Sequence, residues 1–153
     1  MEASEEMISL WRALHKNEVR YVLVGGFAVT MHGFSRITAD IDLWVDDSID
    51  NRKKIRKVLS DIGVGDFKEI ETIPFEPGWS SILLSSGFEL DLMSHMKKFS
   101  AKDFDAAYKN APELIIENTP VKYLHINQLI EEKEALGRTK DKLDLEELKK
   151  LKG

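Results

Sequence analysis

The first part of the chain shows two kinds of hydrophobic spacing. Apolar residues such as Ile8, Trp11 and Leu14 recur every three or four positions among charged residues, which is typical of amphipathic helices. Short runs rich in β-favouring residues are bounded by glycine or polar turns, which is typical of strands. These patterns predict helices over residues 4–16, 27–32 and 48–62, and strands over residues 20–24 and 40–45.

The second part has shorter apolar runs and more turns. Residues 67–73 fit a short strand, whereas two prolines and a glycine make residues 74–79 a loop. A Ser-Ser-Gly turn between two β-rich runs predicts a hairpin, and Ser100 with Asp103 fits a capping box that opens a helix. We expect strands over residues 67–73, 81–84, 88–93, 114–116 and 121–124, and helices over residues 100–109, 126–136 and 140–151.

This order of elements is neither a regular strand–helix alternation nor all-β. We therefore expect an α+β fold with a mixed sheet, flanking helices mainly on one side of it, and a helical C-terminus. A length of 153 residues suits one domain over 1–153, with residues 125–153 as a helical C-terminal extension.

Composition narrows the classes of function. The chain has no cysteine, which excludes disulfides, thiolate metal sites and cysteine nucleophiles. Its start, Met1–Glu6, is acidic, and no apolar run is long enough to span a membrane, so we expect a cytoplasmic protein without a membrane partner. The net charge of −5 argues against an extended surface for duplex nucleic acid. We interpret the basic run over 52–57 as a solvated helix face.

Asp40 and Asp42 carry the first chemical signal. Residues two apart on a strand point to one face, so these two carboxylates share a side while Ile41 and Leu43 face the core. The carboxylates repel each other and strands disfavour aspartate, so a divalent cation is the obvious group to offset both costs. The alternative is that both are ordinary strand-end residues that cap loops.

A later strand repeats this pattern as Glu-Leu-Asp-Leu over residues 89–92. If it lies beside the first strand, Asp91 completes a cluster of three carboxylates, with Glu89 as a solvent-facing or supporting acid. Such oxygen ligands suit Mg²⁺ or Mn²⁺, which keep waters for substrate phosphates. The lack of cysteine and four scattered histidines disfavour zinc.

The turn at Gly25–Gly26 is a candidate phosphate site. Glycine lets the backbone approach a phosphate closely, and the helix that follows offers free N–H groups. Taken alone, such a pair is usually an ordinary turn. Between the turn and the aspartates, Arg36 could hold phosphate oxygens and Thr38 could add a hydrogen bond. Arg36 could also simply pair with a surface carboxylate.

Together these segments resemble the nucleotidyltransferase superfamily. Residues 24–28 (Val-Gly-Gly-Phe-Ala) and 32–43 (His-Gly-Phe-Ser-Arg-Ile-Thr-Ala-Asp-Ile-Asp-Leu) are similar to its signature of a strand, a glycine turn, a helix and an Asp-x-Asp strand. The Gly-Gly-x-Ala form resembles the branch that contains minimal nucleotidyltransferases and abortive-infection toxins. Residues 129–145 look like the tail of the same branch.

The resemblance implies a nucleotidyltransferase-like fold and a two-metal reaction. Asp40 and Asp42 would bind Mg²⁺ or Mn²⁺ ions that bridge a nucleoside triphosphate. Asp91 would hold the metal that activates an attacking hydroxyl. Lys133 would approach the triphosphate from the C-terminal helix, although a solvated lysine in a charged helix is an equal alternative. The products would be an acceptor carrying a nucleoside monophosphate, and pyrophosphate.

Several alternatives stay open at this point. The acceptor could be RNA, a protein or a small molecule, and the branch implies a toxin–antitoxin or phage-defence setting with a toxin or antitoxin as partner. Many members of the superfamily carry serine where this chain has Gly26, so nucleotide binding without catalysis is an alternative, as is a plain interaction domain. The tail could also form a salt-bridged helix junction made by Arg138, Lys140, Asp141 and Asp144.

Overall fold

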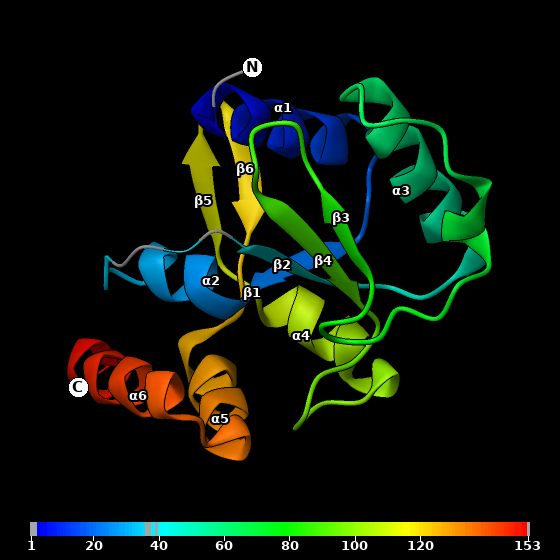
Figure 1. Ribbon diagram of the computed structural model, residues 1–153. Helices are drawn as coiled ribbons and strands as arrows, with labels where there is room; N and C mark the ends of the chain where they lie inside the picture. The colour runs from blue at the N-terminus through cyan, green and yellow to red at the C-terminus, as the bar shows by residue number, and fades with distance from the viewer. Residues whose placement is uncertain (1–2, 36–37, 39, 153) are drawn as a thin grey trace.

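The computed structural model describes residues 3–35, 38 and 40–152 (Figure 1). In chain order the elements are α1 (Ala3–Lys16), β1 (Tyr21–Val24), α2 (Gly25–Met31), β2 (Asp40–Val45), α3 (Ile49–Asp61), the 3₁₀ helix η1 (Lys68–Glu71), β3 (Ser81–Leu83), β4 (Glu89–Met93), the 3₁₀ helix η2 (Ala101–Asp103), α4 (Phe104–Asn110), β5 (Glu113–Ile116), β6 (Thr119–Lys122), α5 (Ile126–Leu136) and α6 (Thr139–Lys152). Within these residues, no helix is both long and apolar enough to cross a membrane.

Four strands form the central sheet in the order β1-β2-β4-β3. β2 runs antiparallel to β1 and parallel to β4, and β3 runs antiparallel to β4. The sheet is therefore mixed, and both the α+β class and the hairpin of β3 with β4 are confirmed. β5 and β6 form a second, two-stranded sheet, which a single bridge between Leu23 and Tyr123 joins to β1.

Helices cover both faces of the central sheet, so the expectation that they lie mainly on one side is wrong. Figure 1 shows α1 and α3 on one side and α4 and α5 on the other. Leu23 and Leu43 pack into the core under α1 and α3, whereas Val22 and Trp44 pack into a second core with α2, α4 and α5. The sequence is consistent with this cover, because a strand buried on both faces has no polar alternation, and residues 43–45 are consecutively apolar.

Two further elements differ from expectation. Residues 67–73 contain η1 instead of a strand, because Phe67, Ile70 and Ile73 recur at the three-residue period of a 3₁₀ helix. Ile70 is the member of this set that is buried. The helix expected over 27–32 begins earlier, at Gly25, so the glycine pair forms the first turn of α2 rather than a loop before it.

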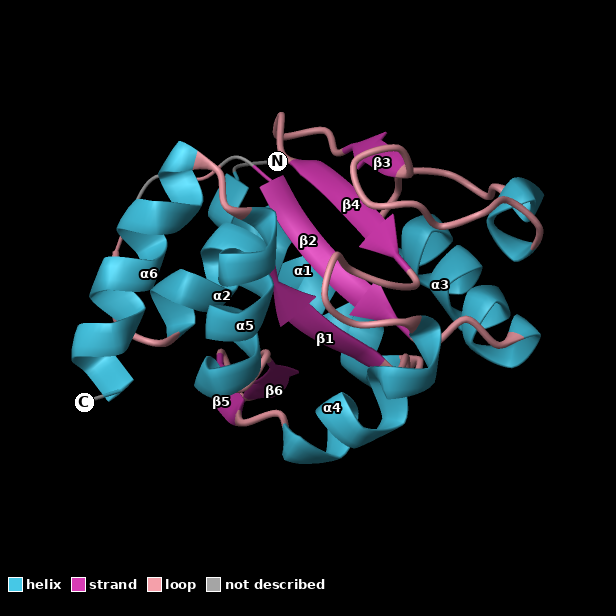
Figure 2. Ribbon diagram, turned by 90° about the horizontal axis from the view of Figure 1, so that it is seen from below, coloured by secondary structure: helices cyan, strands magenta, loops and turns pink. Residues whose placement is uncertain are grey.

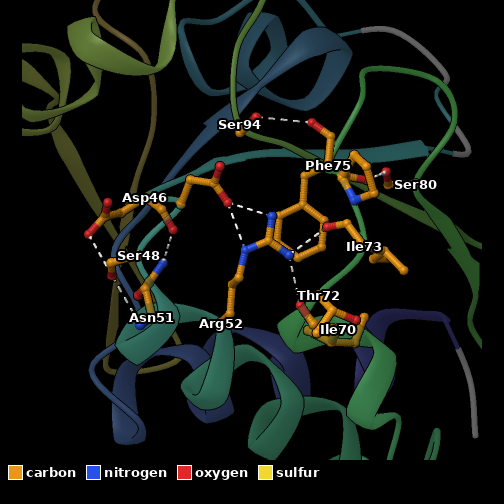
Figure 3. Close-up of polar contacts among 12 residues, drawn as sticks. Asp46, Ser48, Asn51, Arg52, Ile70, Thr72, Ile73, Phe75, Ser80 and Ser94 are labelled. Carbon is orange, nitrogen blue, oxygen red and sulfur yellow. Dashed lines mark hydrogen bonds and ion pairs between the residues drawn. The ribbon is translucent and has the colours of Figure 1, made fainter.

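A buried arginine joins α3 to the loop before β3 (Figure 3). Nη1 of Arg52 donates to the backbone oxygens of Ile70 at 2.9 Å and Ile73 at 2.6 Å. Its guanidinium lies 3.9 Å from the ring centre of Phe75, and its Nε donates to Asp47 at 2.7 Å. The basic run that contains this arginine is therefore not a uniformly solvated helix face. The reason is that the loop carbonyls need buried donors, which a guanidinium supplies.

The last two helices are joined by buried charges. Nζ of Lys133 on α5 lies 3.2 Å from Asp141 and 3.1 Å from Asp144 on α6. Nε of Arg138 lies 2.6 Å from Asp141. Gly137, with φ of 62°, makes the turn between the helices. A salt-bridged junction is thus present, and it holds α6 against α5.

Candidate functional site

The strand register lines up one residue from each strand of the central sheet. Val24 pairs with Asp42, and Asp42 pairs with Asp91. Asp91 in turn pairs with Ser81. Neighbouring strands lie about 4.8 Å apart, so Asp42 and Asp91 stand side by side on one face of the sheet. We call these four residues the central row; it runs from the glycine turn after β1 to the loop before β3.

Gly25 brings the glycine turn directly against Asp42. Its φ of 68° lies in the left-handed region, and a Cβ built on it would stand 2.1 Å from Oδ2 of Asp42. A residue with a side chain would therefore be strained and would displace the carboxylate. The requirement for glycine here comes from the carboxylate as well as from the turn.

Asp42 carries an unfavourable charge in this structure. Burial, followed by repulsion from Asp91 and Asp40, raises the pKa of its carboxyl to about 6, while Lys133 and Lys140 oppose the rise. Among the described residues, no side chain donates a hydrogen bond to this carboxylate or forms an ion pair with it. This carboxylate, next to Gly25, is therefore available to bind a cation that is not part of the chain.

Asp91 is held by the loop that precedes β3. The backbone N–H of Gly78 donates to its Oδ2 at 2.8 Å, and the hydroxyl of Ser81 donates to its Oδ1 at 3.2 Å. Burial raises the pKa of the Asp91 carboxyl and these hydrogen bonds oppose the rise, with the charge of Asp40 adding to it. Asp91 is therefore fixed in place, whereas Asp42 is left for another partner.

Asp40 lies at the exposed start of β2, two residues before Asp42 and on the same face. In the register it stands opposite Glu89, which is exposed, as expected for a solvent-facing acid. The hydroxyl of Thr38 lies 3.4 Å from the backbone N and O of Asp40. The hydroxyl of Thr38 therefore contacts the backbone at the start of β2.

A cavity of about 680 Å³ opens over the central row. Its lining comes from β2, β4, α5 and α6 among others, and Figure 2 shows α5 beside the start of β2, with α6 on the outer side of α5. The cavity brings together nearly all residues that the sequence singled out, namely Gly25, Gly26, Thr38, Asp40, Asp42, Asp91 and Lys133. Arg36 lies outside the described residues.

The junction of α5 and α6 brings three basic side chains to the cavity. Lys133, Arg138 and Lys140 line it together with Glu132, in the same cavity as the carboxylates of β2 and β4. The side chain of Lys133 is 3% exposed and paired with two aspartates of α6, so the alternative of a solvated lysine is wrong. Sequence reasoning assigned Arg138 and Lys140 to the helix junction and missed their place in the site. Their position in the tail motif was the available signal.

Apolar side chains also line the cavity, and we call them the apolar floor. Met96 from the loop after β4, with Leu129 and Leu136 from α5, lines this part of the cavity. The buried carboxylate of Glu132 accepts from the backbone N–H groups of residues 97 and 98, at 3.1 and 2.7 Å. This clamp fixes the loop to α5, so the floor keeps its shape. Sequence reasoning did not find it.

The carboxylates suit a hard cation that arrives with a ligand. In the part of the chain that the structure describes, no group of three or more acidic or histidine side chains is arranged to hold a metal ion. Asp42 and Asp91 nevertheless offer two neighbouring carboxylates, and Mg²⁺ commonly binds one or two carboxylates together with substrate phosphates. The donor set therefore fits a metal–nucleotide complex better than a preformed metal cage.

The chain was compared with known proteins. No family model matches it, and none of the curated proteins matches it significantly. The function is therefore inferred from the residues of the site.

Proposed function

We propose that the protein is a metal-dependent nucleotidyltransferase that moves a nucleoside monophosphate from a nucleoside triphosphate to a hydroxyl of an acceptor. One observation carries the proposal: two adjacent carboxylates of the central row share a single cavity with the basic side chains of the α5–α6 junction. A triphosphate with its divalent cation needs both signs of charge at close range. The resemblance to the nucleotidyltransferase superfamily agrees with this arrangement.

The charges assign the two ends of the nucleotide. Lys133 and Lys140 line the same cavity as Asp42, so we place the β- and γ-phosphates there, against Gly25–Gly26. Arg138 keeps about half of its side chain exposed while it pairs with Asp141, so it has donors left for a phosphate oxygen. Thr38, with Arg36 as the residue expected beside it, adds further contacts. The apolar floor takes the ribose and base.

The reaction is an in-line displacement at the α-phosphorus. The acceptor oxygen forms a bond to that phosphorus, the bond to the bridging oxygen breaks, and pyrophosphate leaves. The carboxylate of Asp91 takes the proton of the attacking hydroxyl. Asp40, Asp42 and Asp91 would hold Mg²⁺ or Mn²⁺, which stabilises charge on the attacking and leaving oxygens when bound. Gly25 and Gly26 keep the triphosphate close to the carboxylates.

Nucleotide binding without transfer is the second candidate, in line with a sensor or a toxin–antitoxin partner protein. It is favoured by Lys133, whose charge is already matched by Asp141 and Asp144. It is also favoured by Gly26, which offers no hydroxyl to a phosphate. A toxin–antitoxin or phage-defence setting, with a toxin or antitoxin partner, follows from the resemblance and belongs to either candidate.

A transfer assay separates these functions. The purified chain is incubated with each of the four α-labelled nucleoside triphosphates, with Mg²⁺ or Mn²⁺, in cell lysate. We expect a labelled acceptor that disappears with chelator and with Asp42→Asn or Asp91→Asn. Asp50→Asn is the matched control, because Asp50 is an exposed carboxylate of α3 outside the cavity.

The results have distinct meanings. Label on any acceptor in the wild type, lost in both central-row variants and kept in the control, supports transfer. Nucleotide binding by calorimetry with no labelled product supports the second candidate. If neither binding nor transfer occurs with any nucleotide, both are wrong.

A further inference from the structure

Trp79 is an exposed aromatic side chain at the edge of the cavity. It is 88% exposed, whereas Trp11 and Trp44, the other two tryptophans, are 1% and 0% exposed. It lines the same cavity as Asp91. An indole that is open to solvent and lines the cavity is available to stack against a ligand that enters it.

The loop that carries Trp79 is fixed at several points. Within it, the hydroxyl of Ser80 donates to the backbone oxygen of Pro74 at 2.9 Å, and the N–H of Glu76 donates to that hydroxyl at 3.0 Å. The N–H of Trp79 itself donates to the backbone oxygen of Glu76 at 3.0 Å. Figure 3 shows Ser80 near one end of this loop and the buried Arg52 holding its beginning. The indole is therefore exposed on a firm support rather than on a loose segment.

Trp79 stands at the Asp91 end of the central row. The residue before it, Gly78, donates to Asp91 at 2.8 Å. Lys133 and Lys140 line the cavity from α5 and α6, whereas Asp91 accepts hydrogen bonds from its own loop. Trp79 is therefore attached to the loop that holds Asp91, next to the contact between Gly78 and this carboxylate.

In-line displacement assigns a role to Trp79. The attacking and leaving oxygens lie on opposite sides of the phosphorus. With the triphosphate held against Gly25–Gly26 beside Asp42, the acceptor hydroxyl approaches from the side of Asp91, whose loop carries Trp79. We infer that Trp79 is the stacking platform for the acceptor, and that the acceptor presents a terminal nucleoside whose base lies on the indole while its hydroxyl meets Asp91. This inference rests on the proposed function.

A nucleoside is the acceptor group whose two parts match an indole and a carboxylate in one cavity. In a nucleoside, one sugar separates a reactive hydroxyl from a flat base, and Gly78, which contacts Asp91, directly precedes Trp79 in the chain. Every base has a π-face, so stacking on an indole holds it without sequence readout. Lys97 also lines the cavity and supplies a cation for the phosphate that would precede the terminal nucleoside.

Tryptophan fluorescence reads this contact directly, because Trp79 is the one indole of the chain that is open to solvent. Wild-type protein is saturated with Mg²⁺ and a non-hydrolysable nucleoside triphosphate, and a single-stranded RNA trinucleotide with a free 3′-hydroxyl is added. We expect quenched emission and protection from iodide. By calorimetry, Trp79→Ala weakens trinucleotide binding about 5- to 150-fold, the range of base–aromatic stacking, and Trp79→Phe retains most of it.

Controls separate this inference from the function on which it rests. Leu83→Ala removes another exposed apolar side chain outside the cavity and leaves trinucleotide binding unchanged. Trp79→Ala leaves the affinity for the triphosphate analogue unchanged. Equal trinucleotide binding by wild type and Trp79→Ala overturns the inference, as does quenching by a tyrosine peptide instead of the trinucleotide. If the triphosphate analogue itself does not bind, the proposed function fails instead.

Discussion

Asp42→Asn is expected to make the metal-free protein more stable at neutral pH. The pKa of the Asp42 carboxyl is raised from 3.8 to about 6, chiefly by burial and then by repulsion from Asp91 and Asp40. One pKa unit corresponds to about 1.4 kcal/mol, so holding this carboxylate ionised in the folded state costs about 3 kcal/mol. Asparagine keeps the shape and removes the charge. Because no described side chain bonds to this carboxylate, little is lost in exchange.

The sign of the pH dependence follows from the direction of that shift. Between about pH 4 and pH 6 the folded state binds more protons at Asp42 than the unfolded state, so stability falls as the pH rises through this window. The cost is complete above pH 6 and is absent well below pH 4. The advantage of Asp42→Asn is therefore expected to approach about 3 kcal/mol at pH 7.5 and to shrink toward zero near pH 4.

Urea unfolding in the presence of chelator measures this difference. Wild type and Asp42→Asn are unfolded at pH 7.5 and pH 4, and the free energies of unfolding are compared. Asp91→Asn serves as the control, because asparagine keeps one acceptor oxygen and so loses the hydrogen bond from either Gly78 or Ser81, and should gain less. If Asp42→Asn is equally or less stable than wild type at pH 7.5, Asp42 does not carry a charge held at a cost, and the reasoning fails.

Three other substitutions test the supports of the site. Gly25→Ala adds a Cβ 2.1 Å from Oδ2 of Asp42, so it should abolish nucleotide binding measured by calorimetry. Gly63→Ala is the control: it adds a similar backbone strain of about 1–2 kcal/mol, since φ is positive there too, but its Cβ stands in open space and binding should stay intact. Lys133→Met removes the buried cation that Asp141 and Asp144 share and should cost about 3–5 kcal/mol in urea unfolding, although Arg138 still pairs with Asp141; an unchanged midpoint would refute the buried cluster. Arg52→Lys keeps the charge, but its single nitrogen cannot reach Asp47 and the two loop carbonyls together, so unfolding should be easier by about 1–3 kcal/mol, and a neutral result would contradict its role as the loop anchor.

Local patterns predicted most of the elements because each carried its own periodicity and its own stop signal. The strand over 40–45 and the helix from Ser48 are examples; the Ser48 side chain accepts from the N–H of Asn51, as a helix cap should. The segment 67–73 failed because apolar residues three apart fit an irregular strand and a 3₁₀ turn almost equally in so short a run. The apolar run over 43–45 indicates a strand that is buried on both faces. The acidic start of the same strand indicates one exposed face, and the two signals conflict.

The candidate site was predictable where it depends on spacing and not where it depends on packing. Asp40 and Asp42 follow from strand alternation, and Asp91 joins them once β4 lies beside β2. The burial of Lys133 between two aspartates could not be foreseen, because it requires α6 to fold back on α5. Trp79 could not be singled out, because nothing in the sequence distinguishes it from Trp11 and Trp44, which are buried.

The most direct test of the account compares two labels on the same nucleotide. A nucleoside triphosphate labelled at the α-phosphate, and the same compound labelled at the γ-phosphate, are each incubated with the chain, Mg²⁺ and cell lysate. The account predicts that acceptor label comes from the α-position alone, that labelled pyrophosphate is released from the γ-labelled compound, and that Asp42→Asn abolishes both. Label transferred from the γ-position, or transfer that persists in Asp42→Asn, would contradict nucleotidyl transfer at the central row.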